Sequence, residues 1–420
     1  MGIGVEKETA QAVEWLRKAD TLGSARAVDL LGDCMKEGDG VPKDEQRAFE
    51  FYRRAADMGY PPAYCDLGLA YEMGEGVEEN PAMAVHFYTE GAKRGHSACA
   101  CNLGYCSLVG IGTEKDPAQA VEWLQRAAQR GSLRAIDLLG NCYESGDGVP
   151  MDKEKAVEYY LDAAQRGYAH AQCDLGFCYY KGIGCTPDAA AAVHWFEQAA
   201  QRGLPRAMSL LSRCYRAGDG VTKDEKQALH YLQEAAKRGY SPAQCNLGLA
   251  YENGDLGLKA DVQEAARLYR LSAEHGDAAA QSNLGHLFLD GDGVKQDYAA
   301  AVHWLTLAAN QGFPTAMYHL GTCYQNGWGV ERDLKRAFEL HMAAAEKGDE
   351  DSMYEVGCFY RDGTAVPQDL EKARQWLQKA VEAGCGDAKE ALAKLGGGSA
   401  GTAAPTQEKK KGFFGKLFGK

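Results

Sequence analysis

No run of apolar residues in this 420-residue sequence is long enough to cross a lipid bilayer. The first residues, MGIGVEKE, lack the apolar core of a secretory signal peptide. The sequence also lacks a phosphate-binding loop, an HExxH zinc-protease motif and a GxSxG nucleophile motif. We therefore expect a cytoplasmic protein that is not an enzyme and that needs no metal or cofactor.

Positive charge is the scarcer sign in this chain. Lysine and arginine number 46 against 59 aspartates and glutamates, which gives a net charge of −13. Because the last twelve residues contribute +5, the other 408 residues carry −18. An acidic body repels the phosphate backbone of nucleic acids, so we do not expect a nucleic-acid partner.

One stretch, residues 135–167, recurs with drift along nearly the whole chain and reads AIDLLGNCYESGDGVPMDKEKAVEYYLDAAQRG. Its first half has apolar residues at i, i+4, i+7 and i+8, the spacing of one helix face. Gly146, Gly148 and Pro150 then interrupt the helix. A second helix is predicted from about residue 151 until Gly167, a residue suited to a left-handed C-cap. Each unit is therefore predicted to be a helix hairpin.

The register of the units is marked by the leucine of an LG pair, replaced by Val356 in the last unit. Successive markers lie 36 residues apart six times, then 37, 36 and 36. The marker leucines are Leu31, Leu67, Leu103, Leu139, Leu175, Leu211, Leu247, Leu284 and Leu320. A fixed period with two helices per unit predicts an all-α solenoid of about ten hairpins. Half-units are expected at both ends, at about residues 6–22 and 386–394.

The repeated pattern A-x3-LG-x2-Y-x2-G-x-GV-x2-D-x3-A-x2-W/Y-x3-AA-x2-G resembles the Sel-one-like repeat (SLR) family, a relative of the tetratricopeptide repeat. The resemblance covers roughly residues 2–395. It implies a right-handed superhelix whose first helices line a concave groove. It also implies the role of a scaffold or adaptor that binds other proteins or peptides in that groove.

The family that this chain resembles includes a secreted branch with a disulfide in each repeat. The placement of the cysteines separates this chain from that branch. At the two positions of those disulfides the chain has mostly alanine, and Cys99 is an exception whose counterpart is Ala92. Most cysteines repeat at one of two slots and alternate with alanine, so we interpret them as reduced packing residues. A secreted-type hydrolase or cell-wall binder remains an alternative function.

The composition changes after residue 395. Residues 1–395 are predicted to form the solenoid, residues 396–408 a flexible Gly/Ser/Ala/Pro linker, and residues 409–420 a basic amphipathic tail. Apolar residues at helical spacing behind a lysine triplet are typical of an anchor for anionic membranes. Its residues are Lys409, Lys410, Lys411, Phe413, Phe414, Lys416, Leu417, Phe418 and Lys420. Alternatively, the tail is a peptide ligand for a groove of its own or another copy, in autoinhibition or self-assembly.

The candidate binding residues occupy two slots that the repeat does not fix, two and five residues after the marker leucine. By resemblance to tetratricopeptide arrays, both slots face the groove. They offer a broken apolar track and a basic spot, which suit a peptide with apolar anchors and an acidic residue. These residues, with Arg206 from the start of a first helix, are Leu69, Tyr105, Leu108, Phe177, Tyr180, Arg206, Arg213, Arg216 and Leu249. The alternative is that they pack against the neighbouring unit.

Two further features concern tryptophan and histidine. Trp328 stands in a loop between two glycines, where we expect an exposed contact point for a partner. Histidines recur at one second-helix slot, at His86, His194, His230 and His303. Copies of that slot lie about 10 Å apart by helix packing, too far for shared metal ligation, so we expect an exposed polar slot. The oligomeric state is left open.

Overall fold

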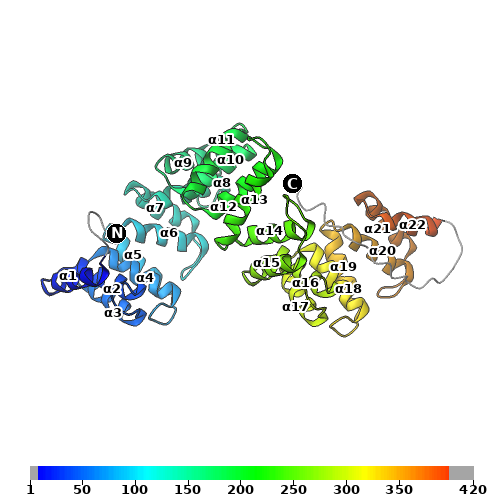
Figure 1. Cartoon of the computed structure of the whole chain (residues 1–420), viewed down its shortest axis with the longest axis horizontal. Helices are drawn as coiled ribbons and strands as arrows, with labels where there is room; N and C mark the ends of the chain where they lie inside the picture. Colours follow the sequence, from blue (N-terminus) through cyan, green and yellow to red (C-terminus); the bar gives the residue numbers. More distant parts are fainter. Residues whose placement is uncertain (1–7, 397–420) are drawn as a thin grey trace. The chain divides into compact units, whose positions relative to one another are not determined.

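The computed structural model describes residues 8–396, and every regular element in them is an α-helix (Figure 1). Two compact units divide the described chain, residues 8–243 and residues 244–396, with the boundary inside one helix. In each unit the helices follow one another as adjacent hairpins in chain order. The predicted all-α repeat architecture is confirmed.

The ten predicted hairpins are all present. Their first helices are α2 (Ala25–Glu37), α4 (Pro61–Met73), α6 (Ser97–Val109), α8 (Leu133–Ser145), α10 (Ala169–Lys181), α12 (Pro205–Ala217), α14 (Ser241–Asn253), α16 (Ala278–Asp290), α18 (Pro314–Asn326) and α20 (Glu350–Asp362). Their second helices are α3 (Glu45–Asp57), α5 (Pro81–Lys93), α7 (Pro117–Gln129), α9 (Lys153–Gln165), α11 (Ala189–Gln201), α13 (Glu225–Lys237), α15 (Val262–Glu274), α17 (Tyr298–Asn310), α19 (Leu334–Glu346) and α21 (Leu370–Ala383). The half-units are α1 (Thr9–Thr21) and α22 (Gly386–Gly396).

Local sequence fixes where these helices begin and end. The repeated aspartate before the second helix is its N-cap, as at Asp152, whose carboxylate accepts a hydrogen bond of 2.9 Å from the Lys155 backbone N–H. The first helix ends at a glycine in the left-handed conformation, as at Gly146 with φ of 83°. Each unit therefore carries its own start and stop signals.

The glycine of the LG pair allows the two helices of a hairpin to approach closely. A Cβ atom at Gly68 would overlap the Tyr88 ring, and one at Gly140 would lie 2.5 Å from a ring carbon of Tyr160. The residue 21 positions after the marker leucine, or 22 at Tyr269 because of the one-residue insertion in its hairpin, thus packs directly on the first-helix backbone. We call this residue the hairpin key; Tyr88 and Tyr160 are both fully buried examples.

The loop glycines fix how consecutive hairpins stack. Gly148, with φ of 74°, lies so close to the Pro117 carbonyl at the start of α7 that an added Cβ would overlap it. Gly112 has the same relation to Pro81, and Gly184 to Lys153. Each of these loops therefore sits on the first turn of the previous second helix, whereas a Cβ added at Gly257, in the loop with the one-residue insertion, would have nothing within 4 Å.

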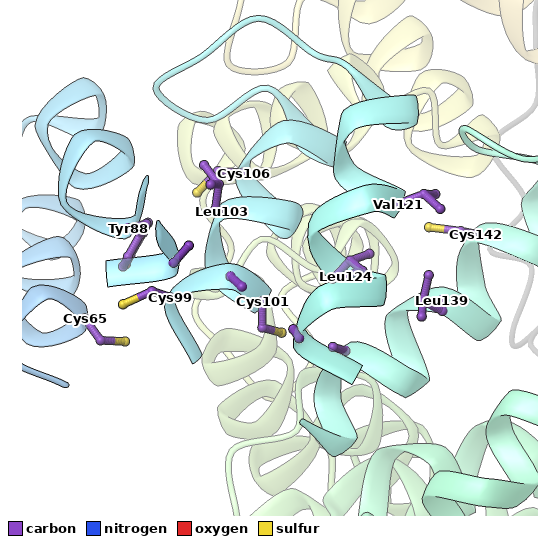
Figure 2. Close-up of a cluster of buried hydrophobic side chains, with 14 of the residues drawn as sticks. Cys65, Tyr88, Cys99, Cys101, Leu103, Cys106, Val121, Leu124, Leu139 and Cys142 are labelled. Carbon is purple, nitrogen blue, oxygen red and sulfur yellow. The ribbon is translucent and has the colours of Figure 1, made fainter. Parts of the chain in front are cut away.

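The repeated cysteines are packing residues, as predicted. Cys106 and Cys142 are at most 1% exposed and lie in one apolar cluster with Leu103, Leu124 and Leu139 (Figure 2). None of the fourteen cysteines, which all lie in the described residues, is in a disulfide, and eleven of them are buried. Burial of these small side chains fills the space between consecutive hairpins.

One buried key within residues 244–396 is a histidine. His341 is 0% exposed, its two ring nitrogens have no hydrogen-bond partner among the described residues, and it packs on Gly321. Burial lowers the pKa of His341 to about 4 and that of nearby His319 to about 3. Both imidazoles must therefore stay neutral in the folded chain.

This burial predicts a loss of stability in mild acid. The unfolded imidazole binds a proton below pH ~6.5, whereas folded His341 does so only below pH about 4, so its contribution is complete above pH ~6.5 and lost as the pH falls towards 4. The substitution His341→Leu, which gives the key found at Leu305, should remove up to about 3 kcal/mol of this acid sensitivity. Urea unfolding at pH 7 and pH 4.5 measures the difference, with exposed His303→Gln as control. Equal pH dependence in wild type and His341→Leu would contradict the assignment.

Candidate partner-binding surface

The two variable slots of the first helices meet across consecutive hairpins. Tyr180, five residues after its marker leucine, lies under the guanidinium of Arg213, two residues after the next marker, at 4.9 Å from ring centroid to Cζ. The Tyr180 hydroxyl also donates a hydrogen bond of 2.8 Å to Asp219 in the following loop. The slots therefore lie on faces of α10 and α12 that adjoin each other.

In four hairpins these slots serve the buried key rather than a partner. Each of the four keys is a tyrosine whose hydroxyl donates to a polar side chain in one or both slots. The pairs are Tyr52 to Asp33 (3.0 Å), Tyr88 to Glu72 (2.5 Å), Tyr160 to Asn141 (2.6 Å) and Glu144 (2.8 Å), and Tyr269 to Glu252 (2.6 Å). Burial and the adjacent carboxylate raise the pKa of Tyr88 and of Tyr160. The acidic and amide slot residues of these hairpins are thus internal hydrogen-bond acceptors.

Where the key has no hydroxyl, the slots carry other side chains. Three hairpins within residues 8–243 have such a key, namely Leu124, Phe196 and Leu232. The corresponding slot residues are Tyr105, Leu108, Phe177, Tyr180, Arg213 and Arg216. The key residue thus separates slots that accept a hydrogen bond from the core from slots of which the core requires no acceptor.

Phe177, Tyr180, Arg213 and Arg216 form the part of this surface that we call the aromatic–arginine patch. All four side chains are partly exposed on α10 and α12. Two atoms of Arg213, Nε and Nη2, are buried without a hydrogen-bond acceptor among the described residues. Exposing this edge of the guanidinium to solvent breaks no hydrogen bond. A carboxylate that binds there would accept two hydrogen bonds, one from Nε and one from Nη2.

Three other apolar candidates belong wholly or partly to the core. Leu69 and Leu108 are partly buried against the apolar cluster of Figure 2, which supports the alternative of packing for these two residues. Leu249 is only 8% exposed and packs with Ala265 and Tyr269. The expectation that Leu249 faces a groove was therefore wrong, because the second helix of its own hairpin covers it.

Two further candidates are engaged in contacts with side chains of the chain itself. Arg206 forms an ion pair of 2.5 Å with Asp174 on the preceding first helix, so the expected basic spot is reduced to Arg213 and Arg216. Tyr105 lies 5.4 Å from the guanidinium of Arg134. These pairings could not be predicted from the sequence, because they depend on which faces of neighbouring first helices are in contact.

Trp328 is not the fully exposed contact point that its loop position predicted. Its ring stacks on Tyr298 with a centroid distance of 5.6 Å and is partly buried against the core of the second unit. The histidine slot, in contrast, is exposed as expected at His86, His194, His230 and His303. The tail candidates of residues 409–420 lie outside the described residues.

One group of side chains was missed by the sequence analysis. Cys65, His96 and Cys99 have sulfur and nitrogen atoms that all lie within 4.8 Å of one another. Cysteines 36 residues apart occupy the same slot of consecutive hairpins and were predicted to lie too far apart to pair. Cys65 and Cys99 occupy different slots and are 34 residues apart. The departure of Cys99 from the alanine of other units was the available signal.

The repeat family follows from a match along almost the entire chain. The model described as Sel1 repeat matches residues 1–24, 25–60, 61–96, 97–132, 133–168, 169–204, 205–240, 241–277, 278–313, 314–349 and 350–385. The chain belongs to the Sel1 repeat family. The resemblance inferred from the repeated pattern is thereby confirmed, and the ten full-length matches are the ten hairpins.

Solved Sel1 repeat structures agree with this membership. A protective antigen of uropathogenic Escherichia coli with an SLR fold is 29% identical, with a TM-score of 0.57 over 96% of this chain and 93% of that one. A Sel1 repeat protein from Oxalobacter formigenes is 33% identical, with a TM-score of 0.50 over 55% of this chain and 97% of that one. No curated protein matches the chain.

Sel1 repeat proteins are generally scaffolds for protein–protein interaction, and the solenoid is typically non-catalytic. The candidate surface on α10 and α12 has the features of such a binding site, with aromatic side chains beside arginines. Within residues 8–396, no helix is both long enough and apolar enough to span a membrane.

Proposed function

We propose that this Sel1 repeat protein is a non-enzymatic scaffold that captures a partner through the aromatic–arginine patch. The observation that supports it most is the Arg213 guanidinium, held on the Tyr180 ring with two nitrogen atoms that lack an acceptor. A buried donor without an acceptor is costly, so a ligand that supplies one gains affinity there. A carboxylate is the acceptor that best matches a guanidinium edge.

The rest of the patch specifies what else the partner segment carries. Phe177 and Tyr180 offer partly exposed aromatic surface one helical turn apart on α10. Such rings bind an apolar side chain and lose little conformational entropy in doing so. The preferred segment therefore has a large apolar residue close to an aspartate, a glutamate or a C-terminal carboxylate.

The same charge argues against the tail as the ligand of this patch. Residues 409–420 contain five lysines and no acidic residue, so arginines would repel them. The acidic slot residues Glu72 and Glu144, which would attract lysines, already accept hydrogen bonds from tyrosine keys. A separate partner is thus the better occupant.

We assign the protein to the cytoplasm, where its free thiols are stable. The secreted alternative, a hydrolase or cell-wall binder, would need the stapling disulfides, and alanine stands at most of those positions. The tail is proposed to recruit the scaffold to anionic membranes by burying its phenylalanines and leucine among lipids while its lysines bind head groups.

Truncation of the aromatic side chains tests the patch. The double variant Phe177→Ala with Tyr180→Ala should lose the proteins that the intact chain captures from its host cell, because the apolar anchor is gone. Arg213→Lys should weaken capture at least tenfold, because an ammonium cannot supply a two-pronged donor edge. Quantitative mass spectrometry of captured proteins, followed by affinity measurement with the purified partner, gives both numbers.

The matched control is His194→Ala with Gln198→Ala, on the second helix of the same hairpin. These side chains lie on α11, so capture should be unchanged, and far-UV circular dichroism should be equal in all variants. If the patch variants and the control bind the partner equally well, the proposed surface is wrong.

Deletion of residues 409–420 tests membrane recruitment separately. The intact chain should float with liposomes that contain anionic lipid and remain unbound with neutral ones, and the deletion should abolish flotation. Replacing Phe413, Phe414, Leu417 and Phe418 by serine keeps every lysine and should also abolish it. Equal flotation of the intact and deleted chains would refute the anchor and leave the patch untouched.

A further inference from the structure

Two cysteines and a histidine converge where α4, α5 and α6 pack together. His96 Nδ1 lies 3.1 Å from Cys99 Sγ, and the Cys65 sulfur completes a triangle whose atoms are all within 4.8 Å. Cys65 is 8% exposed and Cys99 is 0% exposed, whereas His96 is partly exposed. Figure 2 shows the two sulfur atoms next to each other, with Cys65 on α4 and Cys99 on α6.

The other repeats show that this convergence is specific to one junction. Three further cysteines, Cys101, Cys173 and Cys245, occupy the slot of Cys65 two residues before the marker. In the unit that follows each of them, the position of Cys99 holds Ala135, Ala207 or Ala280, and the position of His96 holds Ser132, Leu204 or Asp277. Ordinary packing in this solenoid therefore needs neither Cys99 nor His96.

The second helix has changed to make room for the Cys99 sulfur. Gly91 lies inside α5, where the corresponding residues of the five other complete hairpins in residues 8–243 are Ala55, Ala127, Ala163, Ala199 and Ala235. A Cβ at Gly91 would overlap Cys99 Sγ. Because glycine inside a helix costs about 1 kcal/mol relative to alanine, the exchange weakens the helix in order to seat the sulfur.

Two polar side chains support the Cys65 sulfur. Asn102 Nδ2 donates to Cys65 Sγ at 3.5 Å, and Arg134 holds the amide in this orientation by donating to Asn102 Oδ1 at 2.8 Å.

We propose that Cys65, His96 and Cys99 bind a zinc ion through two thiolates and one imidazole nitrogen. Bonds of about 2.3 Å to sulfur and about 2.0 Å to nitrogen in a tetrahedral site place the ligand atoms roughly 3.5–3.8 Å apart. This separation lies between the 3.1 Å from His96 Nδ1 to Cys99 Sγ and the 4.8 Å within which all three ligand atoms lie. Two thiolates neutralise the charge of the ion in this buried place. The partly exposed side of His96 leaves the fourth position to water or to a side chain of a partner.

The local structure leaves the histidine available for this role. His96 is the N-cap residue of α6, but its side chain caps no backbone N–H group. Asn102 and Arg134 act on the ligand Cys65 as outer partners of the kind that orient metal ligands. Zinc would join the hairpin α4–α5, which holds Cys65, to the hairpin α6–α7, which holds Cys99.

Metal titration of the reduced, full-length chain tests the site. After treatment with a chelator, the protein should bind one equivalent of Zn²⁺ in competition with a zinc-sensitive dye, and its thermal midpoint should rise. Co²⁺ in place of Zn²⁺ should give thiolate-to-metal charge-transfer absorption. Cys99→Ala and His96→Ser restore residues found in other units, so they should fold and should lose this equivalent.

Two variants separate metal binding from packing. Cys173→Ala removes a buried cysteine from the same slot as Cys65 and should keep the full equivalent of zinc. Gly91→Ala changes no ligand and improves helix propensity, yet it should weaken zinc binding at least tenfold by displacing the Cys99 sulfur. Asn102→Ala should weaken it by a similar factor.

Three results would overturn the proposal. They are the absence of saturable zinc binding by the reduced chain, retention of the equivalent in Cys99→Ala, and loss of it in Cys173→Ala. In particular, a chain that takes up no zinc but forms a Cys65–Cys99 disulfide with a mild oxidant contains a redox pair and not a metal site.

Discussion

The close approach of the key to the glycine of the LG pair, which nine of the ten hairpins have and which Ser212 replaces in the tenth, is the contact on which this solenoid depends. At Gly68 and Gly140 no side-chain atom stands between the first helix and the tyrosine ring of the second. The helices can therefore bury a large ring without separating, and the loop glycines pass the same spacing on to the next unit. Repetition of these two contacts produces hairpins at a constant step.

This contact also determines which part of the repeated surface is available to partners. The hydroxyl of a tyrosine key reaches the first helix, where Glu72, Glu144 or Glu252 accepts a hydrogen bond from it. A leucine or phenylalanine key makes no such demand, and α10 and α12 can then present Tyr180 and Arg213. The proposed partner patch thus lies where the core requires no polar acceptor. The proposed zinc site depends on a different contact, because Gly91 has no Cβ atom and therefore leaves room for the Cys99 sulfur.

Much of the fold was predictable because its signals are short-range. Caps such as Asp152 and stops such as Gly146 act within a few residues of the chain, so ten hairpins and two half-units could be counted from the sequence. Residue pairs across helices were harder to predict. The sequence does not say that Arg206 meets Asp174 or that Leu249 is covered by its own hairpin, since both depend on how neighbouring helices turn. The pairing of tyrosine keys with acidic slots is visible in the sequence once the contact is known.

The central claim is that the acidic slot residues are acceptors for the buried keys. A double-mutant cycle on Tyr88 and Glu72, measured by urea unfolding of the intact chain, tests it most directly. Glu72→Leu should cost about 1.5–3 kcal/mol in the wild type, because it leaves a buried phenol without a charged acceptor. In the Tyr88→Phe background the same change should cost close to nothing, since Leu108 occupies this slot above the Leu124 key. Costs that agree within about 0.5 kcal/mol in the two backgrounds would contradict the account.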